Sequence, residues 1–176
     1  MIKRIFYSIT ALIFIVFSGV LLYRHLKYQE YKRSISNISS INYKELTLQE
    51  TEFYNLGNYN CFLVFNSECH FCIDEIENVI DNIEIFKNVN FYLVSNQTEE
   101  ELIEYHKDLE FLGLENFTIL FDKNNVLLSF FDVPAIPSIF FYNKKGELLN
   151  CEIGFIEVSE IISIPKLLID TDTQSD

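Results

Sequence analysis

The chain has 176 residues, enough for one domain of ordinary size with a short appendage but not for two full domains. Hydrophobic residues make up 49% and charged residues 22%, which excludes a disordered or low-complexity chain. The net charge of −13 argues against a general nucleic-acid binder, since such proteins need a basic surface. Residues 1–33 nevertheless carry +5 and residues 34–176 carry −18. A basic amino-terminal segment before an acidic body suggests an anchor joined to a soluble domain.

The amino-terminal segment contains an uncharged, mostly apolar stretch at residues 5–23. As a helix it would be roughly 28 Å long, close to the hydrocarbon thickness of a bilayer. Secretory signal cores are shorter and end at a small-residue cleavage site, whereas Arg24-His25-Leu26-Lys27 follows here. We therefore expect an uncleaved transmembrane signal anchor rather than a buried core helix. A polar stalk should follow it to residue 44.

Two short apolar runs predict buried strands in the first half of the body. They are residues 60–65 and 91–94. Between them, apolar residues recur at helical spacing from Ile73 to Ile83, with acidic residues in the intervening positions. This pattern predicts an amphipathic helix, so the first half is a strand–helix–strand unit.

A second helix is expected from residue 98 to residue 112. Thr98 and Glu101 have the spacing of a capping box, which marks a helix start. The stretch that follows, residues 117–131, shows no regular periodicity and is expected to be less regular.

The last part of the body has the pattern of a hairpin followed by a helix. Strands are expected at residues 138–142 and 147–153, joined by a tight turn at Asn143–Gly146, and a helix at about 158–168. A parallel pair followed by a hairpin predicts an α/β fold with a mixed sheet flanked by helices. The expected organisation is amino terminus, anchor, stalk, domain and flexible acidic tail, at residues 1–4, 5–23, 24–44, 45–168 and 169–176.

The motif that carries chemistry is Cys69-His70-Phe71-Cys72, where a buried strand ends and a helix begins. In the opening turn of a helix, unpaired backbone N–H groups and the helix dipole favour the thiolate of Cys69. A thiolate attacks a substrate disulfide and forms a mixed disulfide. Cys72, one turn later, is then placed to attack Cys69 and release the reduced substrate.

Two other interpretations of this pair remain open. Cysteines are common core residues, so inert packing is one. Half of a zinc site is the other, but a structural zinc site needs a second close pair of Cys or His. Cys61, Cys151 and His106 offer no such pair. The strand-to-helix context favours redox chemistry, and we expect no metal and no bound cofactor.

With the dithiol, the Ile136-Pro137-Ser138 step and the hairpin in place, residues 60–163 resemble the thioredoxin-like fold of membrane-anchored or exported TlpA/ResA-type thiol–disulfide oxidoreductases. The resemblance rests on FLVFNSECHFC, LFDKNNVLLSFFDVPAIPSIFFYNKKGEL and the closing Gly154-Phe155. It implies that Pro137 is a cis-proline facing the dithiol and that Ile136 offers backbone groups to a substrate. It also implies protein disulfides or dithiols as substrates, and a membrane or soluble thiol as electron donor.

The chain departs from the family pattern beside the cysteines. Glu68 and Phe71 stand where relatives usually have Trp and often Pro. Glu68 should oppose a thiolate at Cys69, whereas a protonated His70 would favour it. Leu63 stands where thioredoxins proper carry an acidic residue, so no internal proton acceptor for Cys72 is evident, and acidic helix faces are expected to be solvated.

By the strand order that the resemblance implies, Cys61 and Cys151 lie on non-adjacent strands. A disulfide needs Cα atoms within roughly 7 Å, so we expect both to be unpaired packing residues. The expected function is the reduction or exchange of disulfides in exported proteins. A redox-inactive module that binds a partner peptide is the alternative; the peroxiredoxin pattern Pro-x-x-x-Thr-x-x-Cys is absent.

The expected location is the cell membrane, with the domain on the non-cytoplasmic side. Flanking charge opposes this orientation, because Arg24, Lys27, Lys32 and Arg33 outnumber Lys3 and Arg4. Large domains are translocated with limited regard to such charges, and the anchored relatives work outside the cytoplasm, where disulfides persist.

Overall fold

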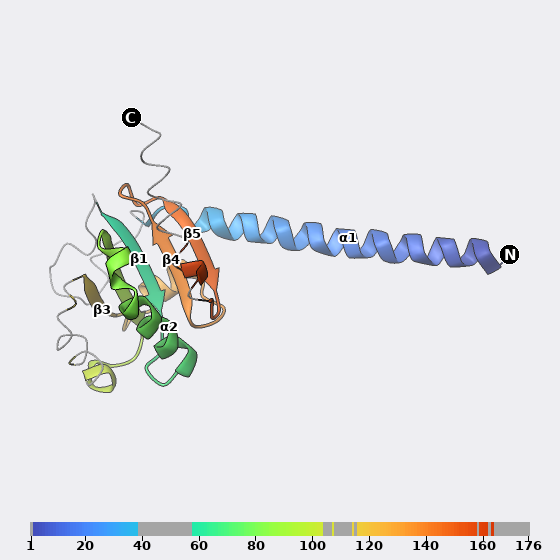
Figure 1. Cartoon of the computed structure of the whole chain (residues 1–176). Coiled ribbons are helices and arrows are strands. Elements are labelled where there is room, and N and C mark those ends of the chain that lie inside the picture. The colour runs from blue at the N-terminus through green and yellow to red at the C-terminus, as the bar shows by residue number, and fades with distance from the viewer. Residues whose placement is uncertain are drawn as a thin grey trace, which may run out of the picture. The chain divides into compact units, whose positions relative to one another are not determined.

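The computed structural model describes residues 2–38, 58–103, 107, 114, 116–157, 159–161 and 163 (Figure 1). It divides into two units, residues 1–36 and 37–176. Each is described by itself.

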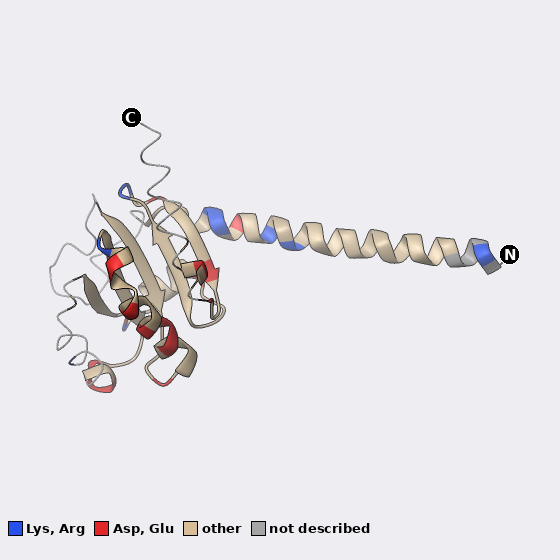
Figure 2. Cartoon of the chain, viewed as in Figure 1, with Lys and Arg blue, Asp and Glu red and all other residues tan. Residues whose placement is uncertain are grey.

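The first unit is one long helix, α1, from Ile2 to Ser34. Its segment Tyr7–Ser34 is long and apolar enough to cross a membrane, with a mean hydropathy of 1.9 over its most apolar window. Helical structure continues beyond residue 23, so the part of the expected stalk up to Ser34 is helical. Lys and Arg lie toward both ends of α1, and its middle carries neither (Figure 2).

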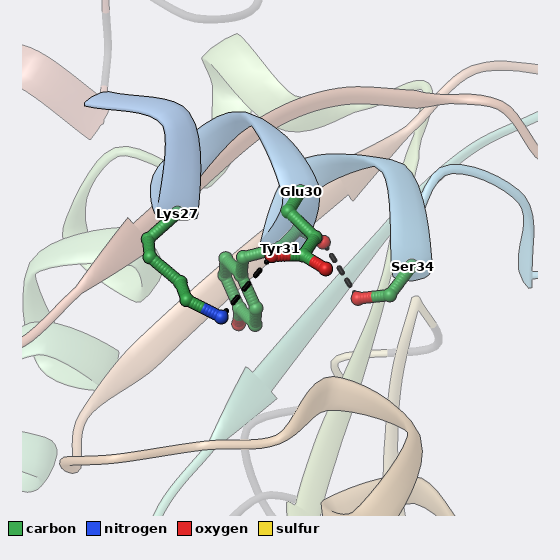
Figure 3. A network of polar contacts seen from close by, with 4 residues as sticks. All are labelled: Lys27, Glu30, Tyr31 and Ser34. Carbon is green, nitrogen blue, oxygen red and sulfur yellow. Dashed lines mark hydrogen bonds and ion pairs between the residues drawn. The ribbon is translucent and has the colours of Figure 1, made fainter. Parts of the chain in front are cut away.

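In the last turns of α1, two polar side chains contact other residues of the same helix (Figure 3). Lys27 Nζ lies 3.2 Å from a carboxylate oxygen of Glu30, and Ser34 Oγ donates to the carbonyl oxygen of Tyr31 at 2.7 Å. Both contacts are exposed, so water competes with them and they support the helix end only weakly.

The second unit contains a five-stranded mixed sheet in the order β3-β2-β1-β4-β5. The pairs β1–β2 and β2–β3 are parallel, and β1–β4 and β4–β5 are antiparallel. This confirms the expected α/β fold with a mixed sheet. The strands are β1 (Tyr59–Val64), β2 (Val89–Ser95), β3 (Phe117–Phe121), β4 (Ser138–Tyr142) and β5 (Leu148–Ile153).

Helices cover both faces of this sheet. The helix α2 (His70–Asp81) continues into a 3-10 turn, η3 (Ile83–Phe86). Buried α2 side chains share one core cluster with Cys61 and Leu63 of β1. On the opposite face, Phe131 of α4 (Val126–Phe131) stacks on Phe140 of β4 with ring centroids 4.2 Å apart. Successive side chains of β1 point to opposite faces of the sheet, and both faces are covered. The strand β1 is therefore buried along its whole length.

The prediction of a less regular stretch at residues 117–131 was wrong, because it contains β3 and α4. The strand β3 is short and lies at the sheet edge, so its pattern is too brief to show a period. The helix α4 depends on a residue before it. The buried Asp122 carboxylate accepts hydrogen bonds from Val126 N and Leu128 N, both at 2.8 Å.

Two local predictions are confirmed. Thr98 N donates to the Glu101 carboxylate at 2.6 Å and Glu101 N donates to Thr98 Oγ1 at 3.3 Å, which is the expected capping box. The hairpin turn closes through Gly146, whose positive φ of 78° suits glycine. Most of the expected helices 98–112 and 158–168, and the tail 169–176, lie outside the described residues.

Candidate active site

Cys69 caps the amino-terminal end of α2. The chain leaves β1 at Val64, crosses a short loop and enters the helix at His70. Cys69 has extended backbone angles, and its Sγ accepts a hydrogen bond from Cys72 N at 3.3 Å. The sulfur therefore occupies the place of an N-cap oxygen, where backbone N–H groups stabilise negative charge.

The two cysteines of the motif differ in exposure. Cys69 is half-buried, whereas Cys72 is fully buried. Cys69 is therefore the thiol that a substrate can reach. Burial is the largest cause that raises the pKa of Cys72 to about 12, followed by a side-chain hydrogen bond with Cys69. Cys72 thus keeps its proton at neutral pH unless a neighbouring group accepts it.

A buried carboxyl group lies beside this thiol. Glu75 of α2 is fully buried, and its charge would raise the pKa of both Cys72 and Cys61. Burial raises the pKa of Glu75 itself to about 7, opposed by the backbone of Ile156. Neither carboxylate oxygen accepts a hydrogen bond of good geometry in the described part of the chain. Glu75 is therefore a carboxyl group that exchanges its proton near neutral pH.

The expectation that the acidic residues of this helix are solvated was wrong for Glu75, which is fully buried. The sequence carried a signal for this residue. Glu75 follows Cys72 by three positions, so both lie on the face that Ile76 and Val79 bury. A carboxyl group on the apolar face of an amphipathic helix is costly, and such groups gather at functional sites.

The Ile136–Pro137 peptide bond is cis, as the resemblance implied. The start of β4 lies beside the end of β1, since Ser138 pairs with Val64. Pro137 O accepts a hydrogen bond from Gly154 N at 2.8 Å. These contacts place Pro137 and Gly154, which directly follows β5, near the carboxyl end of β1. The dithiol loop leaves the sheet at this end.

Exposed apolar side chains occur around the dithiol. Phe71 is 58% exposed, Phe155 45% and Ile136 41%. The rings of Phe71 and Phe155 are in contact, with centroids 5.6 Å apart. These side chains, named here the apolar rim, offer non-polar contact to whatever approaches Cys69.

The charged neighbours of the motif face solvent. Glu68 is exposed, and the His70 ring reaches along the helix to Asp74, with Nε2 3.4 Å from the carboxylate. The side chain of His70 is 83% exposed. Any effect of these two charges on Cys69 is therefore screened by water.

Cys61 and Cys151 are buried, on β1 and β5, which β4 separates. No disulfide joins any of the four cysteines, all of which lie in the described residues. The expected separation of these two thiols is confirmed.

A dithiol at a strand-to-helix junction and a cis-proline at the same edge of this mixed sheet are the features of a thioredoxin-like thiol redox protein. Residues 37–150 match the AhpC/TSA family, and the chain belongs to that family. No curated protein matches the sequence.

Solved structures show the same fold. A secreted Mycobacterium tuberculosis disulfide oxidoreductase homologous to E. coli DsbE is 18% identical, with a match that covers 64% of this chain and 84% of that one and has a TM-score of 0.52. StoA from Bacillus subtilis is 20% identical, with a match that covers 62% of this chain and 84% of that one and has a TM-score of 0.50. Enterococcus faecalis AhpC is 18% identical, with coverages of 69% and 81% and a TM-score of 0.58. At these identities the likeness concerns the fold alone.

Proposed function

We propose that this protein is a membrane-anchored thiol–disulfide oxidoreductase that reduces or exchanges disulfides of exported proteins. The observation that carries the proposal is the asymmetry of the dithiol. Cys69 is accessible at a helix amino terminus, whereas Cys72 is buried beside a carboxyl group with a pKa of about 7. An attacking thiol needs access, and a resolving thiol needs a proton acceptor.

In the first step, the Cys69 thiolate attacks one sulfur of a client disulfide. The client S–S bond breaks, a mixed disulfide forms, and the first client sulfur leaves as a thiolate that takes a proton from water. Attack at this position is favoured by the N–H of Cys72, which already donates to the Cys69 sulfur.

In the second step, Cys72 passes its proton to the Glu75 carboxylate and attacks Cys69. The mixed disulfide breaks, the Cys69–Cys72 disulfide forms, and the second client sulfur leaves as a thiolate. Two electrons have moved from the protein dithiol to the client disulfide. The proton on Glu75 is returned to solvent or to the leaving sulfur, and a thiol electron donor restores the dithiol.

The substrate groove is assigned to Pro137, Ile136 and the apolar rim. A client cysteine bonded to Cys69 brings its flanking residues over this surface, because the mixed disulfide fixes two sulfurs about 2 Å apart. Ile136 would offer its backbone groups to the extended client segment, and Phe71 and Phe155 would contact client side chains.

A redox titration tests the proposal. The full-length protein, kept in detergent and equilibrated with glutathione buffers, is expected to show one two-electron couple involving two of its four cysteines. Mass analysis after alkylation should assign the couple to Cys69 and Cys72. The lack of any reversible couple would instead support the alternative, a redox-inactive module that binds a partner peptide.

The anchor is assigned to residues 5–23 of α1, which overlap the apolar segment Tyr7–Ser34. The domain is placed on the non-cytoplasmic side, where client disulfides persist. A secreted oxidoreductase of the same fold is a precedent for this side. We expect protease added to spheroplasts to digest the domain while the membrane is intact. A domain that stays protected until the membrane is lysed would refute this orientation.

A further inference from the structure

A glutamine far from the dithiol in sequence binds the loop that precedes Cys69. Gln97 follows β2 and lies 30 residues beyond Ser67. Its Oε1 accepts a hydrogen bond from Ser67 N at 2.7 Å, and its Nε2 donates to Ser67 Oγ at 3.0 Å. One side chain thus satisfies both a backbone and a side-chain group of the loop.

Gln97 is itself held by the end of β2. The buried Ser95 donates through its Oγ to Gln97 Oε1 at 3.3 Å and accepts from Gln97 N at 3.2 Å. Ser95 O in turn accepts from Asp122 N at 2.8 Å. The glutamine therefore projects from a rigid part of the sheet rather than from a freely moving loop.

At the start of the loop, Phe65 N donates to Val94 O of β2 at 3.0 Å, and the hydrogen bonds between this residue and Cys69, apart from those to Gln97, are local. Glu68 N donates to Asn66 Oδ1 at 2.8 Å, and Cys69 N donates to Asn66 O at 3.0 Å. These bonds shape the turn but do not place it against the sheet, whereas the bonds from Ser67 to Gln97 do. The backbone of Asn66 also hydrogen-bonds Cys72, where it lowers the thiol pKa. A shift of this loop would therefore change the hydrogen bonds made by both Cys69 and Cys72.

From this geometry we infer that Gln97 is a positioning residue that sets the reactivity of the dithiol through the loop Asn66–Glu68. The inference rests on the proposed function and adds a residue to it. With Gln97 in place, Cys69 stays in the N-cap position with its sulfur on Cys72 N. Without it, Ser67 N loses its partner, the loop samples other positions, and the Cys69 sulfur spends less time at the helix amino terminus.

The test replaces Gln97 with methionine, which has a similar volume and no amide, in the full-length protein in detergent. The rate at which the reduced protein attacks Ellman's reagent at pH 7 is expected to fall about fivefold, the effect of losing one net hydrogen bond. Asn96→Ala is the matched control. Its amide donates to Asn125 at 3.1 Å instead of to the dithiol loop, so its rate should stay near that of the wild type.

A second measurement separates positioning from general loss of packing. Because we infer that Gln97 keeps the reduced Cys69 sulfur on Cys72 N, Gln97→Met is expected to shift the equilibrium with glutathione toward the disulfide about threefold. Ser67→Ala keeps the backbone N–H and should slow the reaction less than Gln97→Met. The double variant should be no slower than Gln97→Met alone, because both changes remove the same contact.

Each outcome decides between these ideas. Equal slowing by Asn96→Ala and Gln97→Met, or an unchanged rate and equilibrium in Gln97→Met, would overturn the positioning role while leaving the proposed function intact. A wild-type protein without a reversible couple would overturn the proposed function itself. If Gln97→Met does not fold, Ser67→Ala carries the test alone, and a wild-type rate and equilibrium in that variant would refute the inference.

Discussion

Cys72→Ser is expected to accumulate mixed disulfides with client proteins, on the order of tenfold more than Cys69→Ser, because only the resolving thiol frees Cys69 from its client. Serine is nearly isosteric with cysteine, and position 72 is fully buried, so the variant keeps the shape of the site while losing its nucleophile. The trapped species are measured as reducible high-mass bands on non-reducing gels after acid quenching, and their linkage to Cys69 by peptide mapping.

Cys61→Ser and Cys151→Ser are the matched controls for this experiment. Both replace a buried cysteine outside the motif, and neither should trap clients above the wild-type level. Equal trapping by the Cys69 and Cys72 variants, or by neither, would count against the assignment of attacking and resolving roles.

Glu75→Gln is expected to slow the resolving step by on the order of 100-fold at pH 8, the usual contribution of a positioned general base. The pKa of Glu75 is raised to about 7, so its carboxylate accepts the Cys72 proton above that pH and is itself protonated below it. In the wild type the resolving rate should therefore rise as the pH passes through about 7. The Gln variant should lose this inflection. Rapid-quench decay of a preformed mixed disulfide measures both rates.

Glu77→Gln is the matched control, because Glu77 lies two residues further along α2 and is exposed. Its resolving rate should follow the wild-type pH profile. A profile with an inflection near 7 that survives in Glu75→Gln would show that another group accepts the proton.

Glu75→Gln should also change how the free energy of unfolding depends on pH. The folded-state pKa of Glu75, about 7, lies above its ordinary value of 4.5, so the folded state binds the proton more tightly than the unfolded state. The stabilisation from this group is present below pH 4.5 and is lost as the pH rises through 7. Glu75→Gln avoids this loss. Its free energy of unfolding relative to the wild type should rise across this window by about 3 kcal/mol at most, as urea unfolding at pH 4.5 and pH 8 would measure.

Several features of this protein follow from the sequence because they depend on neighbours along the chain. The capping box of Thr98 and Glu101 and the turn that ends at Gly146 are set by residue types within a few positions of each other. The position of the dithiol at a strand-to-helix junction could likewise be predicted, since an apolar run precedes the motif and apolar residues at helical spacing follow it. The mixed sheet could be predicted from the order of these local elements.

Other features depend on what lies across the fold. The edge strand Phe117–Phe121 is too short to show a period and is specified by its pairing with β2. By residue type alone, Glu75 does not differ from the other acidic residues of α2, although its spacing places it on the apolar face. Its burial is decided by the core residues around α2 and by the chain near Ile156, which together raise its pKa. Gln97 touches the dithiol loop only because β1 and β2 are parallel neighbours, whose ends meet at one edge of the sheet. The sequence by itself therefore determined which sulfur atoms we propose for the redox chemistry. The tertiary structure decided which groups lie beside them, the buried carboxyl of Glu75 and the amide of Gln97, because burial and long-range hydrogen bonds exist only once the sheet is assembled.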